Sequence, residues 1–273
     1  MTGGELREAL HGGRRVYATS IVSASPQWPD ALRNTGIDFV FIDTEHIPRD
    51  RTVLSWMCAA YREMGLPPIV RIPSPDPYQA CQVLDGGASG IIVPYVESPA
   101  EARALAGAVR WRPLKGQRLR DALDDPGTLE PQLKTYLEER NRNNVLIVNI
   151  ESVPAIEALD DILAVPGLDA VLIGPHDLTC SLGVPEDYQG GALDAAVRTI
   201  VGKARACNIG AGVHCFWEGI EREAEWGRAG ANLMVHSLDA TLFSRALRAD
   251  VAALREALGD SITGEADAGG VVI

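Results

Sequence analysis

Short runs of β-branched and other apolar residues alternate with longer amphipathic segments along most of this chain. The pattern is clearest between residues 145 and 178. There, the apolar runs at 145–150 and 170–173 flank the segment SVPAIEALDDILAV, whose apolar residues recur at helical spacing. A strand, a helix and a second strand in this order form a βαβ unit with parallel strands. We therefore predict that this unit is the one around which the chain is organised.

The same alternation predicts six further strands, with helices between them. The strands are expected at residues 16–22, 38–42, 69–72, 91–93, 210–213 and 232–236. Helices are expected at residues 6–10, 28–35, 51–64, 77–84, 192–207, 217–227 and 238–258, and one more is expected to begin at the capping box of Ser98 and Glu101. Eight strands alternating with helices over 273 residues are typical of an α/β fold of the (β/α)₈ TIM-barrel type. A doubly wound open sheet is the alternative, but no GxGxxG or GxxxxGK turn follows the first strand.

The predicted elements form one domain. Residues 1–258 are expected to be a single (β/α)₈ barrel, and the glycine-rich residues 259–273 are expected to be a flexible tail. The pattern weakens between residues 111 and 144, where only helical pieces near 129–140 can be assigned. This excursion is longer than an ordinary connection, which indicates a lid or an interface element.

Composition and charge narrow the class of protein. Hydrophobic residues make up 46% and charged residues 23% of the chain, as in ordinary soluble globular proteins. No apolar run approaches the roughly 20 residues that span a membrane, and the first residues lack the layout of a signal peptide, so we expect a cytoplasmic protein. The formal net charge of -12 argues against a nucleic acid or an anionic membrane as partner. The five cysteines are scattered, which fits free thiols better than disulfides or a zinc site.

Charged and polar residues stand where the predicted strands end. In a parallel barrel these ends share one mouth, so the side chains are expected to converge there. They are Asp43, Glu45, His46, Arg71, Glu151, Asp177, His214 and His236. Each of these residues alone has an ordinary structural explanation. It is their shared location at one mouth of the barrel that indicates a functional site.

Glu151 and Asp177 are the candidate metal ligands. Both offer hard oxygen atoms without a clustered Cys or His partner, which suits Mg²⁺ or Mn²⁺, with Co²⁺ as a further candidate. Such a cation acts as a Lewis acid on a bound carbonyl group. The structural alternative is that Glu151 caps the following helix and Asp177 begins another one.

Arg71, His46 and Asp43 are the candidate catalytic residues. Arg71 can hold a carboxylate or a developing enolate oxygen, because a guanidinium offers two parallel donors and stays charged; a structural ion pair is the alternative. The imidazole of His46 is a candidate for proton transfer, and Asp43, three residues earlier, can fix its tautomer or cap the next turn. His214 and His236 are weaker candidates for specificity, and His176 is expected to offer its backbone more than its side chain.

Five motifs resemble one known family. They are FIDTEH at 41–46, IVRIP at 69–73, LDGGASGIIVPYVES at 84–98, NIES at 149–152 and IGPHDLTCSLG at 173–183. In this order, and over roughly residues 5 to 258, they are similar to the HpcH/HpaI family of class II pyruvate aldolases. The resemblance implies a phosphoenolpyruvate/pyruvate-type (β/α)₈ barrel. It also implies a homo-oligomer, commonly a hexamer of dimers that exchange their last helix, here residues 238–258.

The resemblance also implies roles for particular residues. Its metal-binding acids fall on Glu151 and Asp177, its catalytic histidine on His46 with Asp43 in support, and its enolate-stabilising arginine on Arg71. Asp85 matches an aspartate that reaches toward the neighbouring subunit's site. The turn of Gly174, Pro175, His176 and Asp177 matches the loop whose backbone binds the pyruvate carboxylate. The implied reaction is the reversible cleavage of a 4-hydroxy-2-oxo acid to pyruvate and an aldehyde.

The chain departs from the family pattern mainly on the aldehyde side. It has Asn149 in place of glutamine, His176 in place of alanine, and the unusual segment 214–217 after the seventh strand. A tryptophan common near the first strand is absent around Ser20, so Ser20 and Glu45 join the specificity candidates. Two alternatives follow: an oxaloacetate decarboxylase or biosynthetic carbon–carbon bond-forming enzyme that uses the same enolate, and a non-catalytic barrel that binds a 2-oxo acid.

Overall fold

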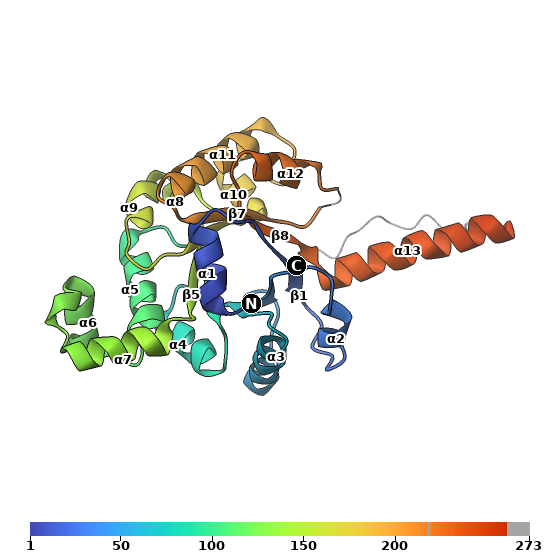
Figure 1. The fold of residues 1–273 in the computed structure, drawn as a ribbon. Helices are drawn as coiled ribbons and strands as arrows, with labels where there is room; N and C mark the ends of the chain where they lie inside the picture. Colours follow the sequence, from blue (N-terminus) through green and yellow to red (C-terminus); the bar gives the residue numbers. More distant parts are fainter. Residues whose placement is uncertain (218, 261–273) are drawn as a thin grey trace.

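Eight parallel strands form a closed barrel in which each strand pairs with its neighbours in chain order, as the computed structural model shows (Figure 1). The closed ring of eight parallel strands confirms the predicted (β/α)₈ barrel. The structure describes residues 1–217 and 219–260, so residues 261–273 of the predicted flexible tail lie outside it. The strands are β1 Val16–Ile21, β2 Phe39–Asp43, β3 Pro68–Arg71, β4 Gly90–Val93, β5 Val145–Asn149, β6 Ala170–Ile173, β7 Gly210–Cys215 and β8 Leu233–Leu238.

Helices follow the strands and surround the barrel (Figure 1). The predicted capping box is confirmed at the start of the fifth helix, where Ser98 accepts from the backbone of Glu101 and the Glu101 carboxylate accepts from the backbone of Ser98. The helical segments are α1 Gly3–His11, α2 Trp28–Leu32, α3 Arg51–Glu63, α4 Pro77–Asp85, α5 Pro99–Arg110, α6 Gly116–Asp124, the 3₁₀ turn η1 Pro126–Thr128, α7 Pro131–Asn141, α8 Val153–Glu157, α9 Leu159–Leu163, α10 Pro175–Ser181, α11 Gly191–Ala206, α12 Glu221–Arg228 and α13 Asp239–Leu258.

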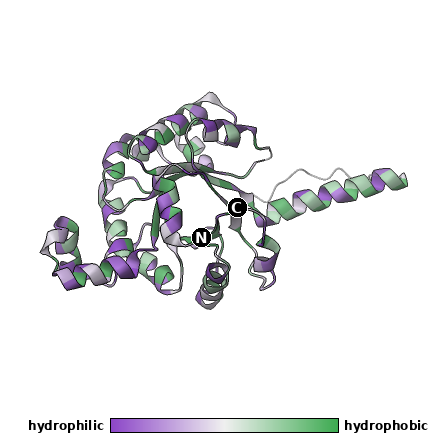
Figure 2. Cartoon of the chain, viewed as in Figure 1, coloured by the Kyte–Doolittle hydropathy of each residue, from purple (hydrophilic) through white to green (hydrophobic). Residues whose placement is uncertain are grey.

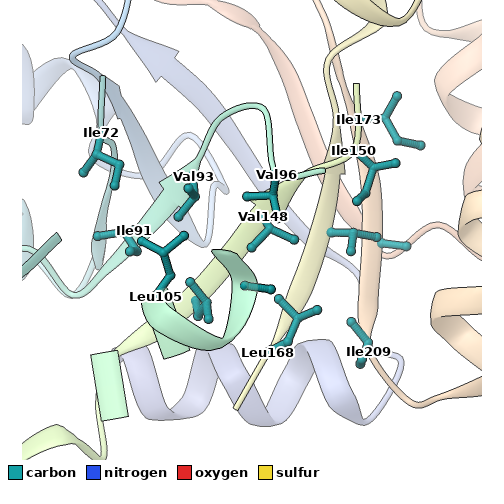
Figure 3. Packing of buried hydrophobic residues seen from close by; sticks show 14 of the residues in the cluster. Ile72, Ile91, Val93, Val96, Leu105, Val148, Ile150, Leu168, Ile173 and Ile209 are labelled. Carbon is teal, nitrogen blue, oxygen red and sulfur yellow. The ribbon is translucent and has the colours of Figure 1, made fainter. Parts of the chain in front are cut away.

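Two apolar layers hold the barrel together because strand residues alternate between its inside and its outside. The inner layer includes Phe41 and Ile147, and α1 closes it from below with Leu6 and Leu10, which are fully buried. The outer layer fills the space between strands and helices. Figure 3 shows part of it, with Val148 of β5 near Leu105 of α5.

The structure corrects three predicted helices. The single helix expected between β5 and β6 is two short helices, α8 and α9, which meet at Ala158. The helix expected at 217–227 begins only at Glu221, because Gly219 adopts a φ of +90° that a helix does not allow. The helix expected at 28–35 ends at Leu32. The excursion at 111–144 contains α7, as expected near 129–140, and also α6, which the weak pattern did not predict.

Helix α13 extends away from the barrel instead of covering it (Figure 1). Among its residues only Asp239 is buried, and its apolar side chains are interspersed with polar ones along its length (Figure 2).

A cavity of about 710 Å³ lies against the outer face of β1 and β8, where Leu32, Ile37 and Met234 contribute to its lining. No helix in the described part of the chain is long and apolar enough to cross a membrane.

Candidate active site

Polar side chains form the uppermost layer inside the barrel. The alternation that points Phe41 of β2 inward also points Asp43 inward, two residues later. The same period brings a polar residue to the mouth on four further strands: Ser20 on β1, Arg71 on β3, Asn149 on β5 and His214 on β7. The structure therefore brings together Ser20, Asp43, Arg71 and His214 of the predicted site.

Glu151 is the buried acid of this mouth, with a relative exposure of 2%. One carboxylate oxygen accepts from the backbone N–H of Tyr95 at 2.7 Å, and the other accepts from the Asn149 side chain at 2.9 Å. Tyr95 has a φ of +49°, uncommon for a residue with a side chain, and in this conformation its N–H reaches Glu151. Two donors thus fix the position of the Glu151 carboxylate.

Nearby acids oppose the ionisation of Glu151. Burial raises its pKa to about 7, and the charges of Asp177 and Glu45 add to this effect against the backbone hydrogen bond from Tyr95 and the charge of Arg71. Burial also raises the pKa of Glu45, although the charges of Arg71 and His46 lower it. The mouth therefore carries an excess of negative charge around Glu151, which a bound cation would relieve.

The turn after β6 approaches Glu151 closely. A Cβ atom at Gly174 would lie 2.2 Å from Glu151 Oε2, so only glycine fits beside this carboxylate. Pro175 opens α10 at its first position, and His176 and Asp177 follow in the same short helix. Asp177 lies partly exposed in the first turn of this helix, and its negative charge contributes to the raised pKa of Glu151.

Arg71 holds two carboxylates at the mouth. Its Nε and Nη2 atoms donate to the two carboxylate oxygens of Asp43 at 2.9 and 2.7 Å, and its Nε lies 3.1 Å from a carboxylate oxygen of Glu45. Burial alone would raise the pKa of Asp43, but the hydrogen bonds and charge of Arg71 outweigh it and hold the pKa below its usual range. Glu45 also lies 3.6 Å from Nε2 of His46, which is exposed.

This arrangement differs from the expected support of His46 by Asp43. Both oxygens of Asp43 are bound by Arg71, so the carboxylate nearest the His46 ring is Glu45. The physical reason is strand register, because Asp43 and Arg71 are direct partners across β2 and β3.

The donor atoms present suit a hard divalent cation. Within the described residues, no three His, Cys, Asp or Glu side chains gather as a ready-made metal cage. Glu151 and Asp177 supply two carboxylates, and Asn149, which donates to Glu151, has a buried Oδ1 without a hydrogen-bond partner in the described structure. Two carboxylates that leave the remaining positions to water and substrate are typical of Mg²⁺ sites. The residues therefore fit the implied cation.

Two predicted residues lie outside the mouth. His236 was expected there, but it points from β8 toward α12, where its Nδ1 donates to Glu223 at 2.8 Å. The reason is again the strand period, which sends Val235 into the barrel and His236 outward. Asp85 ends α4, is largely exposed, and forms an ion pair with Arg112 at 3.3 Å.

The histidines at the mouth have different surroundings. Burial and the charge of Arg71 lower the pKa of His214 to about 4, so the ring is neutral at pH 7, and Nε2 donates to the Ser237 carbonyl at 3.1 Å. His176 was expected to contribute mainly its backbone. Its Nδ1 is hydrogen-bonded to the Tyr188 hydroxyl at 2.9 Å, which holds the ring next to Asp177.

Sequence reasoning missed Asn149 and Tyr95 as partners of Glu151. The two-residue spacing from Asn149 to Glu151 could have identified the first, because both positions continue one face of β5. No comparable signal marks Tyr95, whose contribution is a backbone N–H set by an unusual φ.

Comparisons with known proteins agree with this geometry. The sequence profile described as HpcH/HpaI aldolase/citrate lyase matches residues 21–246. A hydroxypyruvate/pyruvate aldolase of Deinococcus radiodurans is 33% identical over 97% of this chain and 95% of its own length. A hydroxypyruvate/pyruvate aldolase of Roseovarius nubinhibens is 32% identical over 91% and 96%, respectively. Among solved structures, citrate synthase SbnG is 28% identical with a TM-score of 0.79 over 93% of this chain and 99% of that one.

The family profile covers most of the chain, and the relatives named as aldolases align along nearly its whole length. The resemblance seen in the five sequence motifs is thereby confirmed. The chain belongs to the HpcH/HpaI aldolase/citrate lyase family and is a lyase of the aldolase type.

Proposed function

We propose that this protein is a metal-dependent aldolase that reversibly cleaves a 4-hydroxy-2-oxo acid to pyruvate, or a close 2-oxo acid, and an aldehyde. The observation that carries the proposal is the buried Glu151 carboxylate, which is held by Tyr95 and Asn149 and whose pKa responds to the nearby charges of Asp177 and Arg71. Relatives named hydroxypyruvate/pyruvate aldolase support the same reaction class.

Glu151 and Asp177 would hold the cation, Mg²⁺, Mn²⁺ or Co²⁺. When bound, the cation would polarise the 2-oxo group of the substrate and lower the energy of negative charge on its oxygen. The backbone of the turn from Gly174 to Asp177 would receive the substrate carboxylate, because the N-terminal N–H groups of a helix are free to donate. A substrate held by these groups would have its reacting C3–C4 bond in the mouth.

His46 would transfer the proton in the reaction, and Arg71 would stabilise the negative charge that develops. His46, with Glu45 at 3.6 Å, would remove the C4 hydroxyl proton, and the C3–C4 electron pair would pass to the 2-oxo group as the aldehyde leaves. Arg71 would stabilise the resulting enolate oxygen with its charge. Protonation of C3 then yields pyruvate, so that one proton is added for the one removed from the C4 hydroxyl group.

The direct test is pyruvate release from a 4-hydroxy-2-oxo acid by chelator-treated protein with and without added Mg²⁺, Mn²⁺ or Co²⁺. We expect activity only when metal is restored, and we expect Glu151→Gln to lack it under the same conditions. Equal activity with and without metal, or an active Glu151→Gln variant, would contradict the proposal.

The second candidate is an enzyme that uses the same enolate in another reaction, either oxaloacetate decarboxylation or carbon–carbon bond formation. Two observations support this second candidate: the similarity to citrate synthase SbnG, and the unusual segment after β7. CO₂ release from oxaloacetate without aldol cleavage would select this candidate over the first.

We also propose that two or more copies of the chain associate through α13, as the family resemblance implies. The apolar residues of α13 are exposed, while the cavity against β1 and β8 offers an apolar surface next to the base of this helix. In such an assembly the exposed Asp85 would be available to a neighbouring copy.

A further inference from the structure

Three aromatic side chains pack together beside the mouth, and we call Tyr188, Phe216 and Trp217 the aromatic cluster. The ring centroids of Tyr188 and Phe216 lie 5.1 Å apart in a T-shaped contact, and those of Tyr188 and Trp217 lie 5.3 Å apart in a stacked one. Phe216 and Trp217 follow β7, whereas Tyr188 lies between α10 and α11. Two separate loops therefore meet in one apolar surface.

One end of the aromatic cluster contacts His214 at the mouth. The ring centroid of Phe216 lies 6.3 Å from that of His214, and the His214 centroid lies 5.3 Å from that of Phe41. The Arg71 guanidinium lies 5.3 Å from the centre of the same Phe41 ring. The aromatic cluster thus touches the mouth at His214, while the buried ring of Phe41 lies between His214 and Arg71.

The other end reaches the metal side. The Tyr188 hydroxyl is hydrogen-bonded to His176 at 2.9 Å, and His176 precedes Asp177 directly. Burial and nearby negative charges, that of Asp177 among them, raise the pKa of Tyr188. The aromatic cluster therefore lies between His176, on the helix that follows β6, and His214, at the end of β7.

This edge of the mouth offers ring surface more than hydrogen-bonding capacity. All three side chains of the aromatic cluster are half-buried, and the Tyr188 hydroxyl already has a partner in His176. A polyhydroxylated aldehyde would lose water here without gaining matching partners, whereas a planar ring could stack on or against these side chains.

We propose that the aromatic cluster binds the aldehyde partner and that this aldehyde carries an aromatic ring in place of a polyhydroxylated chain. The proposal rests on the proposed function, because it names the acceptor of the same pyruvate enolate. Phe216 is the residue expected to contribute most to selectivity, because its ring contacts both His214 at the mouth and Tyr188 of the aromatic cluster.

The test compares acceptors in the synthetic direction with pyruvate and the metal that supports activity. Benzaldehyde, acetaldehyde and D-glyceraldehyde serve as aromatic, small apolar and polyhydroxylated acceptors. We expect kcat/KM for benzaldehyde to exceed that for glyceraldehyde at least tenfold. Phe216→Ala should reduce the benzaldehyde-to-acetaldehyde ratio of kcat/KM about tenfold, and Phe216→Leu should reduce it less. Tyr136→Ala, which removes an exposed ring on α7, is the matched control and should leave the ratio unchanged.

A separate reaction distinguishes failure of this proposal from failure of the proposed function. Exchange of the pyruvate methyl hydrogens for deuterium in D₂O reports enolate formation without any acceptor. Wild-type protein that catalyses the exchange but prefers glyceraldehyde, or a Phe216→Ala variant with an unchanged ratio, would overturn the acceptor proposal alone. Absence of both exchange and aldol product with every metal would overturn the proposed function and the acceptor proposal with it.

Discussion

At the scale of single residues, the sequence indicated which groups reach the mouth but not how they pair. The strand ends identified Glu151, Asp43 and Arg71, because the end of a parallel strand is a position that the apolar pattern reveals. The pairing of Asp43 with Arg71 depends on the register between β2 and β3, which no local pattern specifies. His236 was misplaced for a related reason: a strand end alone does not say which side of the barrel a residue faces.

The Glu151 carboxyl should make the stability of the metal-free protein depend on pH. Its pKa is raised by burial to about 7 in the folded protein from the 4.5 of a solvent-exposed glutamate, so the folded state binds the proton more tightly. The stabilising effect of that proton is complete below pH 4.5 and is lost as the pH rises through 7, a change of about 3 kcal/mol. We therefore expect Glu151→Gln to raise the free energy of unfolding relative to wild type by up to about 3 kcal/mol at pH 8 and by little at pH 4.5.

Urea unfolding in the presence of a chelator at the two pH values measures this difference. The amide in Glu151→Gln could still accept from Tyr95, and after rotation of the Asn149 amide it could donate to the Asn149 oxygen that now lacks a partner. The titration of His214 is present in both proteins and cancels. A variant destabilised equally at both pH values would contradict the buried, proton-binding role of Glu151.

Arg71 should not be replaceable by lysine. A lysine would keep one positive charge but lose the two parallel donors to Asp43 at 2.9 and 2.7 Å. We expect Arg71→Lys to lower kcat about 100- to 1000-fold while the far-ultraviolet circular dichroism spectrum stays that of the wild type. Arg33→Lys, on the surface beside Asp30, is the matched control. A kcat within threefold of wild type would show that Arg71 is only structural.

At the scale of elements, boundaries set by capping and periodicity were predictable and boundaries set by packing were not. The capping box at Ser98 was read directly from the sequence, because its hydrogen bonds are local. The break at Ala158 between α8 and α9 left no glycine or proline signal, and the late start of α12 depends on the positive φ of Gly219, which the helical pattern at 217–227 did not reveal. The loops beside the mouth are therefore the part that the sequence revealed least.

The turn between β6 and α10 should tolerate no side chain at Gly174. An alanine Cβ there would lie 2.2 Å from Glu151 Oε2, so Gly174→Ala must displace the carboxylate or the turn. We expect at least a 100-fold loss of metal-dependent kcat/KM for aldol cleavage. Gly202→Ala, within α11 and with no atom near its added Cβ, is the control; it should keep activity and gain about 0.5–1 kcal/mol of stability. Full activity of Gly174→Ala would contradict the close approach.

At the scale of the whole molecule, the exposed apolar face of α13 has no packing partner among the described residues of a single chain. Phe243, Leu247, Val251, Leu254 and Leu258 recur at helical spacing and are all exposed. Such a contiguous apolar stripe on a 20-residue helix typically marks an interaction surface. The sequence predicted the helix and its amphipathic character, but periodicity alone could not distinguish packing on its own barrel from packing on another copy.

Charge on the apolar face of α13 should disrupt association. We expect Leu247→Asp to give a smaller species than wild type in size-exclusion chromatography with light scattering, because it would bury an unpaired carboxylate at the interface. Ala249→Asp, on the opposite face of the same helix, carries the same charge change and should leave the mass unchanged. A wild-type protein that is monomeric at micromolar concentration would contradict association through α13.

The central claim is that Glu151 and Asp177 hold a cation with which the barrel forms the enolate of pyruvate. The most direct measurement is deuterium exchange into the methyl group of pyruvate, followed by NMR in D₂O with chelator-treated protein. We expect exchange when Mg²⁺, Mn²⁺ or Co²⁺ is added to the wild type, none without metal, and none with Glu151→Gln. Exchange that is independent of added metal, or that persists in Glu151→Gln, would contradict the claim.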